Sequence, residues 1–110
     1  MHKERSEIEK IIGRFKNALE NHGVKVDKII LFGSHAKGTA NKFSDIDLVV
    51  ISPDFAKMNF QRRCEILGKA IAHVMEPIEP LAYTPEEFRN ISVSNIAGMI
   101  MEDKSEYVVI

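Results

Sequence analysis

Two aspartates separated by a single residue are the feature of this sequence best suited to chemistry. Asp45 and Asp47 open an apolar run that continues to Ile51. Side chains two apart on a strand point to the same face, roughly 6–7 Å from each other. Neighbouring carboxylates raise each other's pKa unless a cation lies between them, and Mg²⁺ prefers such oxygen ligands. The pair therefore indicates a Mg²⁺ site, although a solvated strand end with Asp45 in a turn would have the same sequence.

A glycine and a serine precede this pair, directly after the apolar run Val26–Phe32. Gly33 allows the backbone to turn sharply and to approach a ligand closely. The residues that follow it can open a short helix whose free N–H groups attract phosphate. Ser34 adds a small hydroxyl donor, and Gly38 is a second permissive position. A Gly-Ser pair after a strand is usually only a turn, but a return of the chain to Asp45 would place a phosphate cradle beside the metal ligands.

The elements around these residues follow from apolar periodicity, capping residues and prolines. Pro80 predicts that its strand lies at a sheet edge, because proline has no N–H to donate to a neighbour. Thr84 and Pro85 have the sequence of a helix start. In chain order, the sequence predicts a helix over Ile8–Leu19, strands over Val26–Phe32 and Asp45–Ile51, a helix over Phe60–Val74, a strand over Ile78–Tyr83, helices from Thr84 and near Ser94–Glu102, and a strand over Tyr107–Ile110.

The spacing of the two motifs resembles a known signature. Gly33-Ser34, ten residues, then Asp45-x-Asp47 looks like the signature of the polymerase-beta-type nucleotidyltransferase superfamily. The longer string Phe-Gly-Ser-His-Ala-Lys-Gly followed by Ser-Asp-Ile-Asp-Leu-Val-Val resembles its minimal stand-alone branch, called MNT. The resemblance implies an α/β (α+β) fold in which helices flank a mixed β-sheet, with Gly33 and Ser34 holding a triphosphate.

The same resemblance implies three catalytic carboxylates that bind Mg²⁺. Two would be Asp45 and Asp47, and the third would lie on a later strand. Glu79 falls on the third expected strand, where the family pattern places an Asp or Glu. A carboxylate there could share a metal and accept the proton of an attacking hydroxyl. Glu76 is the rival, although it sits at the expected end of a helix, and the choice between the two glutamates stays open.

The nucleotide-binding residues expected from the resemblance are Gly33, Ser34, Lys37, Gly38 and Ser44. Many relatives carry arginine at the position of Lys37, and lysine keeps the charge but loses the two-pronged hydrogen bonding of a guanidinium. His35 lies within the phosphate loop and could touch the ligand, but we expect it to face solvent. Cys64 has no catalytic partner nearby in the sequence, so we interpret it as a core residue.

Length and charge narrow the function. The 110 residues predict one domain over 1–110, with no room for a separate acceptor-binding domain. A net charge of -1 gives no general attraction for nucleic acid, so no direct nucleic-acid binding is expected. A single cysteine, no visible secretory signal and no membrane-length apolar run are typical of a cytoplasmic protein that does not contact a membrane.

The expected function is therefore Mg²⁺-dependent transfer of AMP from ATP to a hydroxyl. In the MNT branch the resemblance implies a companion HEPN-domain protein, often a ribonuclease toxin, with which the chain would form a hetero-oligomer. The chain would act as antitoxin by adenylylating that partner on a tyrosine. Two alternatives remain: a non-catalytic nucleotide-binding antitoxin that acts by contact alone, and a transferase for a small molecule, which normally needs a further domain.

Overall fold

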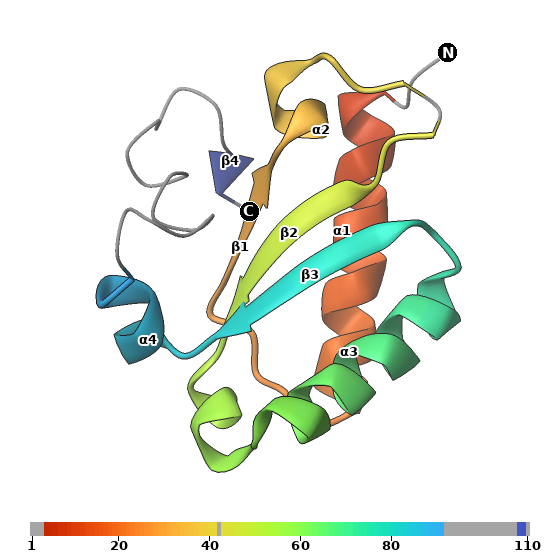
Figure 1. Cartoon of the computed structure of the whole chain (residues 1–110). Coiled ribbons are helices and arrows are strands. Elements are labelled where there is room, and N and C mark those ends of the chain that lie inside the picture. The colour runs from red at the N-terminus through yellow and green to blue at the C-terminus, as the bar shows by residue number, and fades with distance from the viewer. Residues whose placement is uncertain (1–3, 42, 92–107, 110) are drawn as a thin grey trace.

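The computed structural model describes residues 4–41, 43–91, 108 and 109, which form a mixed sheet with helices (Figure 1). The strand order is β3-β2-β1-β4. Strand β1 pairs antiparallel with β2 and with β4, whereas β2 pairs parallel with β3. The elements are α1 (Arg5–Asn21), β1 (Lys28–Phe32), α2 (Ser34–Lys37), β2 (Ile46–Ile51), the 3-10 helix η1 (Pro53–Lys57), α3 (Phe60–Val74), β3 (Ile78–Tyr83), α4 (Pro85–Arg89) and β4 (Val108–Val109).

The main hydrophobic core lies between α1, α3 and one face of the sheet. Leu48 and Val50 on β2 point to these helices because side chains alternate across a strand. Phe15 of α1 and Phe55 of η1 are fully buried in the same cluster. The guanidinium of Arg14 donates to the carbonyl of Val74 over 3.0 Å, which satisfies one of the unpaired acceptors at the end of α3. Helices α1 and α3 therefore cover one face of the sheet, and the other face is not covered by them.

The second face of the sheet carries a smaller apolar cluster and the candidate catalytic residue Asp47. Val49 and Ile51 of β2 are buried there with Ile30 of β1. Asp47 is two residues before Val49, so it projects from the same face, away from α1 and α3. The alternation of side chains in β2 therefore puts the residues that pack on α1 and α3 on one face and Asp47 on the other.

Strand β3 forms an edge of the sheet among the described residues, as Pro80 predicted. The carbonyl of Pro77 accepts a hydrogen bond from Ile46 N at the start of β2, over 2.8 Å. The carbonyl of Tyr83 accepts one from Ser52 N, just after β2, over 3.0 Å. Because parallel strands bond through alternate residues, the backbone groups of Pro80 and Ala82 point outward. Pro80 therefore stands where its missing N–H costs no ladder bond, and it weakens this edge as a template for another strand.

Helix α3 covers the residues expected, but its buried face differs from the predicted one. Cys64 is exposed, so its interpretation as a core residue was wrong. Phe60, in the same predicted stripe, is 83% exposed. The buried residues of α3 are Ile66, Leu67, Ala70 and Val74. The reason is position: the first turns of α3 lie beside the outer edge of β3, and only the later turns reach the face of the sheet.

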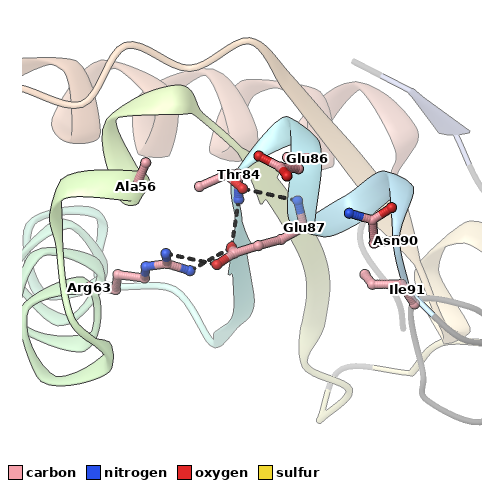
Figure 2. Close-up of a pocket in the computed structure, with 7 residues that line it drawn as sticks. All are labelled: Ala56, Arg63, Thr84, Glu86, Glu87, Asn90 and Ile91. Carbon is pink, nitrogen blue, oxygen red and sulfur yellow. Dashed lines mark hydrogen bonds and ion pairs between the residues drawn. The ribbon is translucent and has the colours of Figure 1, made fainter.

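Arg63 of α3 contacts three other elements, and Figure 2 shows its contact with Glu87 of α4. Its Nε and Nη2 donate to the carbonyl of Phe55 over 3.1 and 2.7 Å, and its Nη1 donates to Ala82 over 3.4 Å. Nη1 and Nη2 also contact the Glu87 carboxylate at 2.8 and 3.1 Å. One guanidinium thus links η1, β3 and α4 to α3.

Helix α4 begins at the position that Thr84 and Pro85 predicted, and a capping box fixes its start. Thr84 Oγ1 accepts from Glu87 N over 3.0 Å, and Thr84 N donates to a Glu87 carboxylate oxygen over 2.8 Å. The predicted helix near 94–102 lies outside the described residues, as do the ends of the predicted strand over 107–110. No helix in the described part of the chain is long and apolar enough to cross a membrane.

The Arg63–Glu87 contact predicts a pH-dependent stability. Hydrogen bonding to Arg63 lowers the pKa of Glu87, so this carboxylate stabilises the fold above its unfolded pKa. That contribution is lost as pH falls through the lowered folded pKa. We expect Glu87→Gln, which keeps an oxygen for Thr84 N, to lower the free energy of unfolding at pH 7 by about 1 kcal/mol or less, since the pair is partly exposed. Urea unfolding at pH 7 and pH 3 measures it, and an equal loss at both pH values would contradict the charge argument.

Candidate active site

The turn after β1 places Gly33 against the side chain of Asp47. Phe32 and Asp47 are direct partners in the antiparallel pairing of β1 with β2, so the next residue lies beside the Asp47 carboxylate. Gly33 has a φ of 72°, a conformation that L side chains rarely adopt. A Cβ added there would overlap Asp47 Oδ2. Glycine is therefore required twice at this position, by its backbone angle and by the carboxylate it approaches.

Helix α2 follows at once and forms a compact turn. It spans Ser34–Lys37 and ends at Gly38, whose φ of 80° is left-handed. Ala36 N donates to the Gly33 carbonyl over 3.1 Å, and Thr39 N donates to the Ser34 carbonyl over 3.0 Å. The N–H groups that open a helix have no acceptor within it, so Ser34 and His35 present theirs at the start of this turn. The backbone of the expected phosphate loop is therefore shaped as the sequence predicted.

His35 does not face solvent, which corrects the expectation from sequence. Its side chain is buried, with 8% of its surface exposed. Its Nε2 lies 3.3 Å from the carbonyl oxygen of Ser44. The backbone carbonyl of His35 accepts a hydrogen bond from the Arg5 guanidinium over 3.5 Å. The ring therefore bridges α2 and the residue just before Asp45. The sequence missed this role because nothing local to His35 indicates that the chain returns beside it.

Ser44 shapes the loop before β2. Its hydroxyl oxygen accepts from Asn41 N over 3.0 Å, and its own N–H donates to the Asn41 carbonyl over 3.1 Å. These two bonds close the turn that precedes Asp45. The expected direct contact of Ser44 with nucleotide stays a prediction, and its described contacts are with the turn itself.

The parallel pairing of β2 with β3 sets a second carboxylate opposite Asp47. Asp47 and Glu79 are register partners, on adjacent strands and on the same face. Asp45 precedes β2 and is exposed, whereas Asp47 is half-buried. Glu76 lies in the connection between α3 and β3, where its carbonyl accepts from Ile78 N over 2.8 Å. Of the two glutamates that the sequence left open, Glu79 is the one that the sheet aligns with Asp47.

The electrostatics of Asp47 reflect this arrangement. Burial raises the pKa of the Asp47 carboxyl, and the nearby charge of Asp45 raises it further. Glu79 raises that pKa as well, while His35 lowers it. A carboxylate disfavoured by burial and by two like charges gains from any cation placed among them.

The three carboxylates do not form a closed metal cage. Within the described residues, no three His, Cys, Asp or Glu side chains gather as a group that could hold a metal ion. Asp45 and Glu79 are both exposed, whereas Asp47 is half-buried. The donor set is nevertheless all oxygen, and Mg²⁺ usually takes only one or two protein carboxylates, with phosphate and water completing its shell. The residues therefore fit Mg²⁺ brought in with a nucleotide better than a metal held by the protein alone.

A family model supports the same assignment. The model of the nucleotidyltransferase domain matches residues 8–107. The chain belongs to this family. The resemblance seen in the Gly33-Ser34 and Asp45-x-Asp47 motifs is thereby confirmed, together with the mixed α/β fold that it implied.

Two curated relatives come from the archaeon Methanocaldococcus jannaschii. The candidate protein adenylyltransferase MJ1305 is 32% identical over 94 residues, which make up 83% of this chain and 62% of that protein. The candidate protein adenylyltransferase MJ0604 is 46% identical over 44 residues, or 39% of this chain and 44% of that protein. The chain therefore spans less than two thirds of the length of either relative.

Solved structures share the fold. A crystal structure of a toxin–antitoxin with AMP-PNP has a TM-score of 0.60 at 21% identity, covering 88% of this chain and 69% of that one. A mutant of the toxin–antitoxin MntA-HpeT has a TM-score of 0.56 at 20% identity, covering 92% of this chain and 69% of that one. At these identities the likeness establishes the architecture alone.

The overlap at Gly33 predicts the effect of a single methyl group. We expect Gly33→Ala to displace the Asp47 carboxylate and to strain the backbone, which costs roughly 1–3 kcal/mol of stability. Thermal unfolding measures the loss, and Gly13→Ala in α1, where an added Cβ meets nothing, is the matched control. A Gly33→Ala protein as stable as the parent would show that the close approach to Asp47 is not a real constraint.

The raised pKa of Asp47 predicts that its charged carboxylate lowers the free energy of unfolding at neutral pH. Its charged form is disfavoured in the fold, so the cost is present above the folded pKa and disappears as pH falls below the unfolded value of 3.8. Without Mg²⁺, Asp47→Asn should therefore stabilise the fold at pH 7 by up to about 1 kcal/mol, the size of a relieved like-charge contact. Chemical unfolding at pH 7 and pH 3 tests this, with the exposed Asp27→Asn as control. Destabilisation by Asp47→Asn at pH 7 would contradict the prediction.

Proposed function

We propose that this chain is a Mg²⁺-dependent nucleotidyltransferase that moves AMP from ATP to a hydroxyl of a partner protein. The observation that carries the proposal is the alignment of Phe32, Asp47 and Glu79 across three strands, with Gly33 against Asp47. This alignment puts Gly33, Asp47 and Glu79 at neighbouring positions, which supports their joint use as a phosphate-binding turn and two metal-binding carboxylates. We further propose that residues 1–110 act as a single domain.

Each residue has a role that its place supports. The N–H groups at the start of α2 and the hydroxyl of Ser34 bind the triphosphate, with Gly33 and Gly38 permitting the tight turn. Lys37, the last residue of α2, adds a positive charge for the phosphates, and Ser44 holds the turn before Asp45. Together these residues fix the nucleotide with its α-phosphoryl group towards the carboxylates.

The carboxylates then act on the acceptor. Asp45, Asp47 and Glu79 would hold Mg²⁺, which when bound neutralises the negative charge on the phosphoryl oxygens. Glu79 also accepts the proton of the acceptor hydroxyl. The acceptor oxygen bonds to the α-phosphorus as the bond to pyrophosphate breaks, so pyrophosphate leaves and AMP stays on the acceptor. Because the exposed Glu79 lies on an edge strand, an acceptor can reach it from outside the sheet.

The partner we propose is a HEPN-domain toxin, with this chain as its antitoxin in a hetero-oligomer. The MNT-type motifs and the fold shared with toxin–antitoxin structures support this assignment. An antitoxin that acts by contact alone would use the same fold and the same partner. The two mechanisms differ in whether the carboxylates are needed once the complex has formed.

Label transfer from α-³²P-ATP with Mg²⁺ to proteins of the host lysate tests the proposal. We expect one labelled host protein with the parent chain and none with Asp45→Asn. Loss of a carboxylate that binds metal or accepts a proton should slow transfer by roughly 10²-fold or more. A pull-down from the same lysate asks separately whether the partner still binds. Absence of label from the parent, although Mg·ATP binds and a partner is recovered, would favour the contact-only antitoxin.

Two glutamates in this assay form a matched pair. Glu79→Gln should abolish transfer while Mg·ATP binding falls only modestly, since Asp45 and Asp47 remain. Glu76→Gln removes the same charge from the α3–β3 connection and should transfer at close to the parent rate. The reverse result would move the third carboxylate to Glu76 and would contradict the role that we assign from the sheet register.

A further inference from the structure

His35 is a buried polar side chain that the proposed mechanism does not use. Three polar side chains are buried among the described residues, namely His35, Ser52 and Thr84. Ser52 and Thr84 cap η1 and α4, because their side-chain oxygens accept from Asp54 N and Glu87 N. His35 caps no helix: it lies within α2, and its ring contacts a residue nine positions later in the chain. Burial of a polar ring is unfavourable unless the ring is hydrogen-bonded, so this contact is what makes the burial of His35 tolerable.

The Nε2 atom of His35 is the donor of this contact. It lies 3.3 Å from the backbone carbonyl oxygen of Ser44, which can only accept, so the hydrogen is on Nε2. The other groups of Ser44 are also engaged. Its N–H donates to the Asn41 carbonyl over 3.1 Å, and its hydroxyl oxygen accepts from Asn41 N over 3.0 Å. Three hydrogen bonds thus fix the residue that precedes Asp45.

Helix α2 is anchored by contacts other than those of the His35 ring. Ala36 packs against the main hydrophobic core. The Arg5 guanidinium of α1 donates to the backbone carbonyl of His35 over 3.5 Å. Gly33, which precedes the helix, lies close against the side chain of Asp47. The His35 ring therefore connects an anchored helix to the loop before β2.

The two segments that this hydrogen bond joins are the two parts of the proposed nucleotide site. Helix α2 supplies Ser34 and the N–H groups that we expect to bind the triphosphate. Ser44 is followed directly by Asp45, which lies before β2. The described pairings of β2 begin at Ile46, so the position of Asp45 relative to α2 depends on the loop before it. The His35 bond ties that loop to α2.

We propose that His35 is a positioning residue for the nucleotide, which holds α2 and Asp45 in the arrangement that a Mg²⁺-bound triphosphate binds, through its bond to the Ser44 carbonyl. Because the bond is buried, it persists when no nucleotide is bound, and the nucleotide loses no free energy in ordering the loop. The recognised part of the substrate is the triphosphate, since both ends of the bond lie at phosphate-binding or metal-binding positions. This inference rests on the proposed function and adds to it a residue that is neither a ligand nor a catalyst.

Three substitutions separate the hydrogen bond of His35 from the volume of its ring. His35→Gln places an amide N–H as many bonds from the backbone as Nε2, so it restores the donor. His35→Asn places its amide nitrogen at the position of Nδ1, too short to reach Ser44. His35→Phe keeps a ring but has no donor. We expect the Kd for Mg·ATP to rise roughly three- to tenfold with His35→Phe and His35→Asn, and less than about twofold with His35→Gln, the effect of one hydrogen bond.

Mg·tripolyphosphate, which has neither base nor ribose, is the second probe. His35→Phe should raise the Kd for this ion by the same factor as the Kd for Mg·ATP, as measured by titration calorimetry. An effect on Mg·ATP alone would assign His35 to the base or the ribose and would overturn its role in triphosphate binding. Equal affinities of the parent, His35→Phe and His35→Asn for both probes would also overturn the proposal.

Val24→Ala controls for a general loss of stability. Val24 is fully buried in the main core and lies just after α1, whereas α2 lies beside the start of that helix (Figure 1). This variant should unfold at a lower temperature than the parent but bind Mg·ATP with the same Kd. An equal loss of affinity in Val24→Ala and His35→Phe would show that the effect is one of stability only, which overturns the proposal. If His35→Phe does not fold, His35→Gln and His35→Asn give the same comparison with two amides that differ by one methylene.

Amide hydrogen exchange in the absence of nucleotide tests the positioning without binding or catalysis. The Ser44 N–H is bonded to the Asn41 carbonyl, so its exchange rate reports how firmly this turn is held. With His35→Phe and His35→Asn we expect exchange at Ser44 to be at least about threefold faster than in the parent, with His35→Gln close to the parent rate. Unchanged exchange at Ser44 in all three variants overturns the inference.

The outcomes distinguish this inference from the proposed function. A parent that binds Mg·ATP and transfers label, with His35→Phe equal to it in both, refutes the role of His35 alone. A parent that binds Mg·ATP with the expected His35 dependence, but transfers no label, refutes catalysis and leaves the positioning role supported. A parent that binds neither Mg·ATP nor Mg·tripolyphosphate refutes the proposed function and the nucleotide-positioning role together.

Discussion

The repulsion between carboxylates aligned by the pairing of β2 with β3 is the constraint on which this site depends. Asp47 and Glu79 are held opposite each other by backbone hydrogen bonds, and Asp45 adds a third negative charge. Such an arrangement is unfavourable by itself, and burial of Asp47 makes it more so. The fold must therefore supply the stability elsewhere, and the apolar layer beneath the sheet, packed against α1 and α3, provides it. A cation placed among these carboxylates would relieve this repulsion.

Alternation along the strands keeps stability and chemistry apart. In β2, Leu48 and Val50 face the helices while Asp47 faces away from them. A substitution on one face of β2 can therefore leave the side chains of the other face in place. Strand β3 is an edge strand among the described residues, so Glu79 is both aligned with Asp47 and exposed at that edge.

Arg63 shows how a charged residue organises the region next to the site. It bonds the carbonyl of Phe55, pairs with Glu87 and lies over the Phe55 ring with its central carbon 5.6 Å from the ring centre. Together with the hydrogen bond from Arg63 to the carbonyl of Ala82, these contacts hold the start of α3 beside β3, η1 and α4.

The sequence by itself determined the order of the main helices and strands from α1 to α4, the edge position of β3 through Pro80, and the turn at Gly33 after β1, because each depends on local periodicity or on a short motif. It also identified the nucleotidyltransferase family, since the two motifs of that signature lie close together in the sequence. Only the tertiary structure decided what depends on residues distant in the chain. The β2–β3 register aligned Glu79 rather than Glu76 with Asp47. The return of the chain buried His35 beside Ser44, and the offset of α3 from the sheet exposed Cys64. Periodicity locates an apolar stripe, but which part of it meets the core depends on where the helix crosses the sheet, and no local pattern encodes that position.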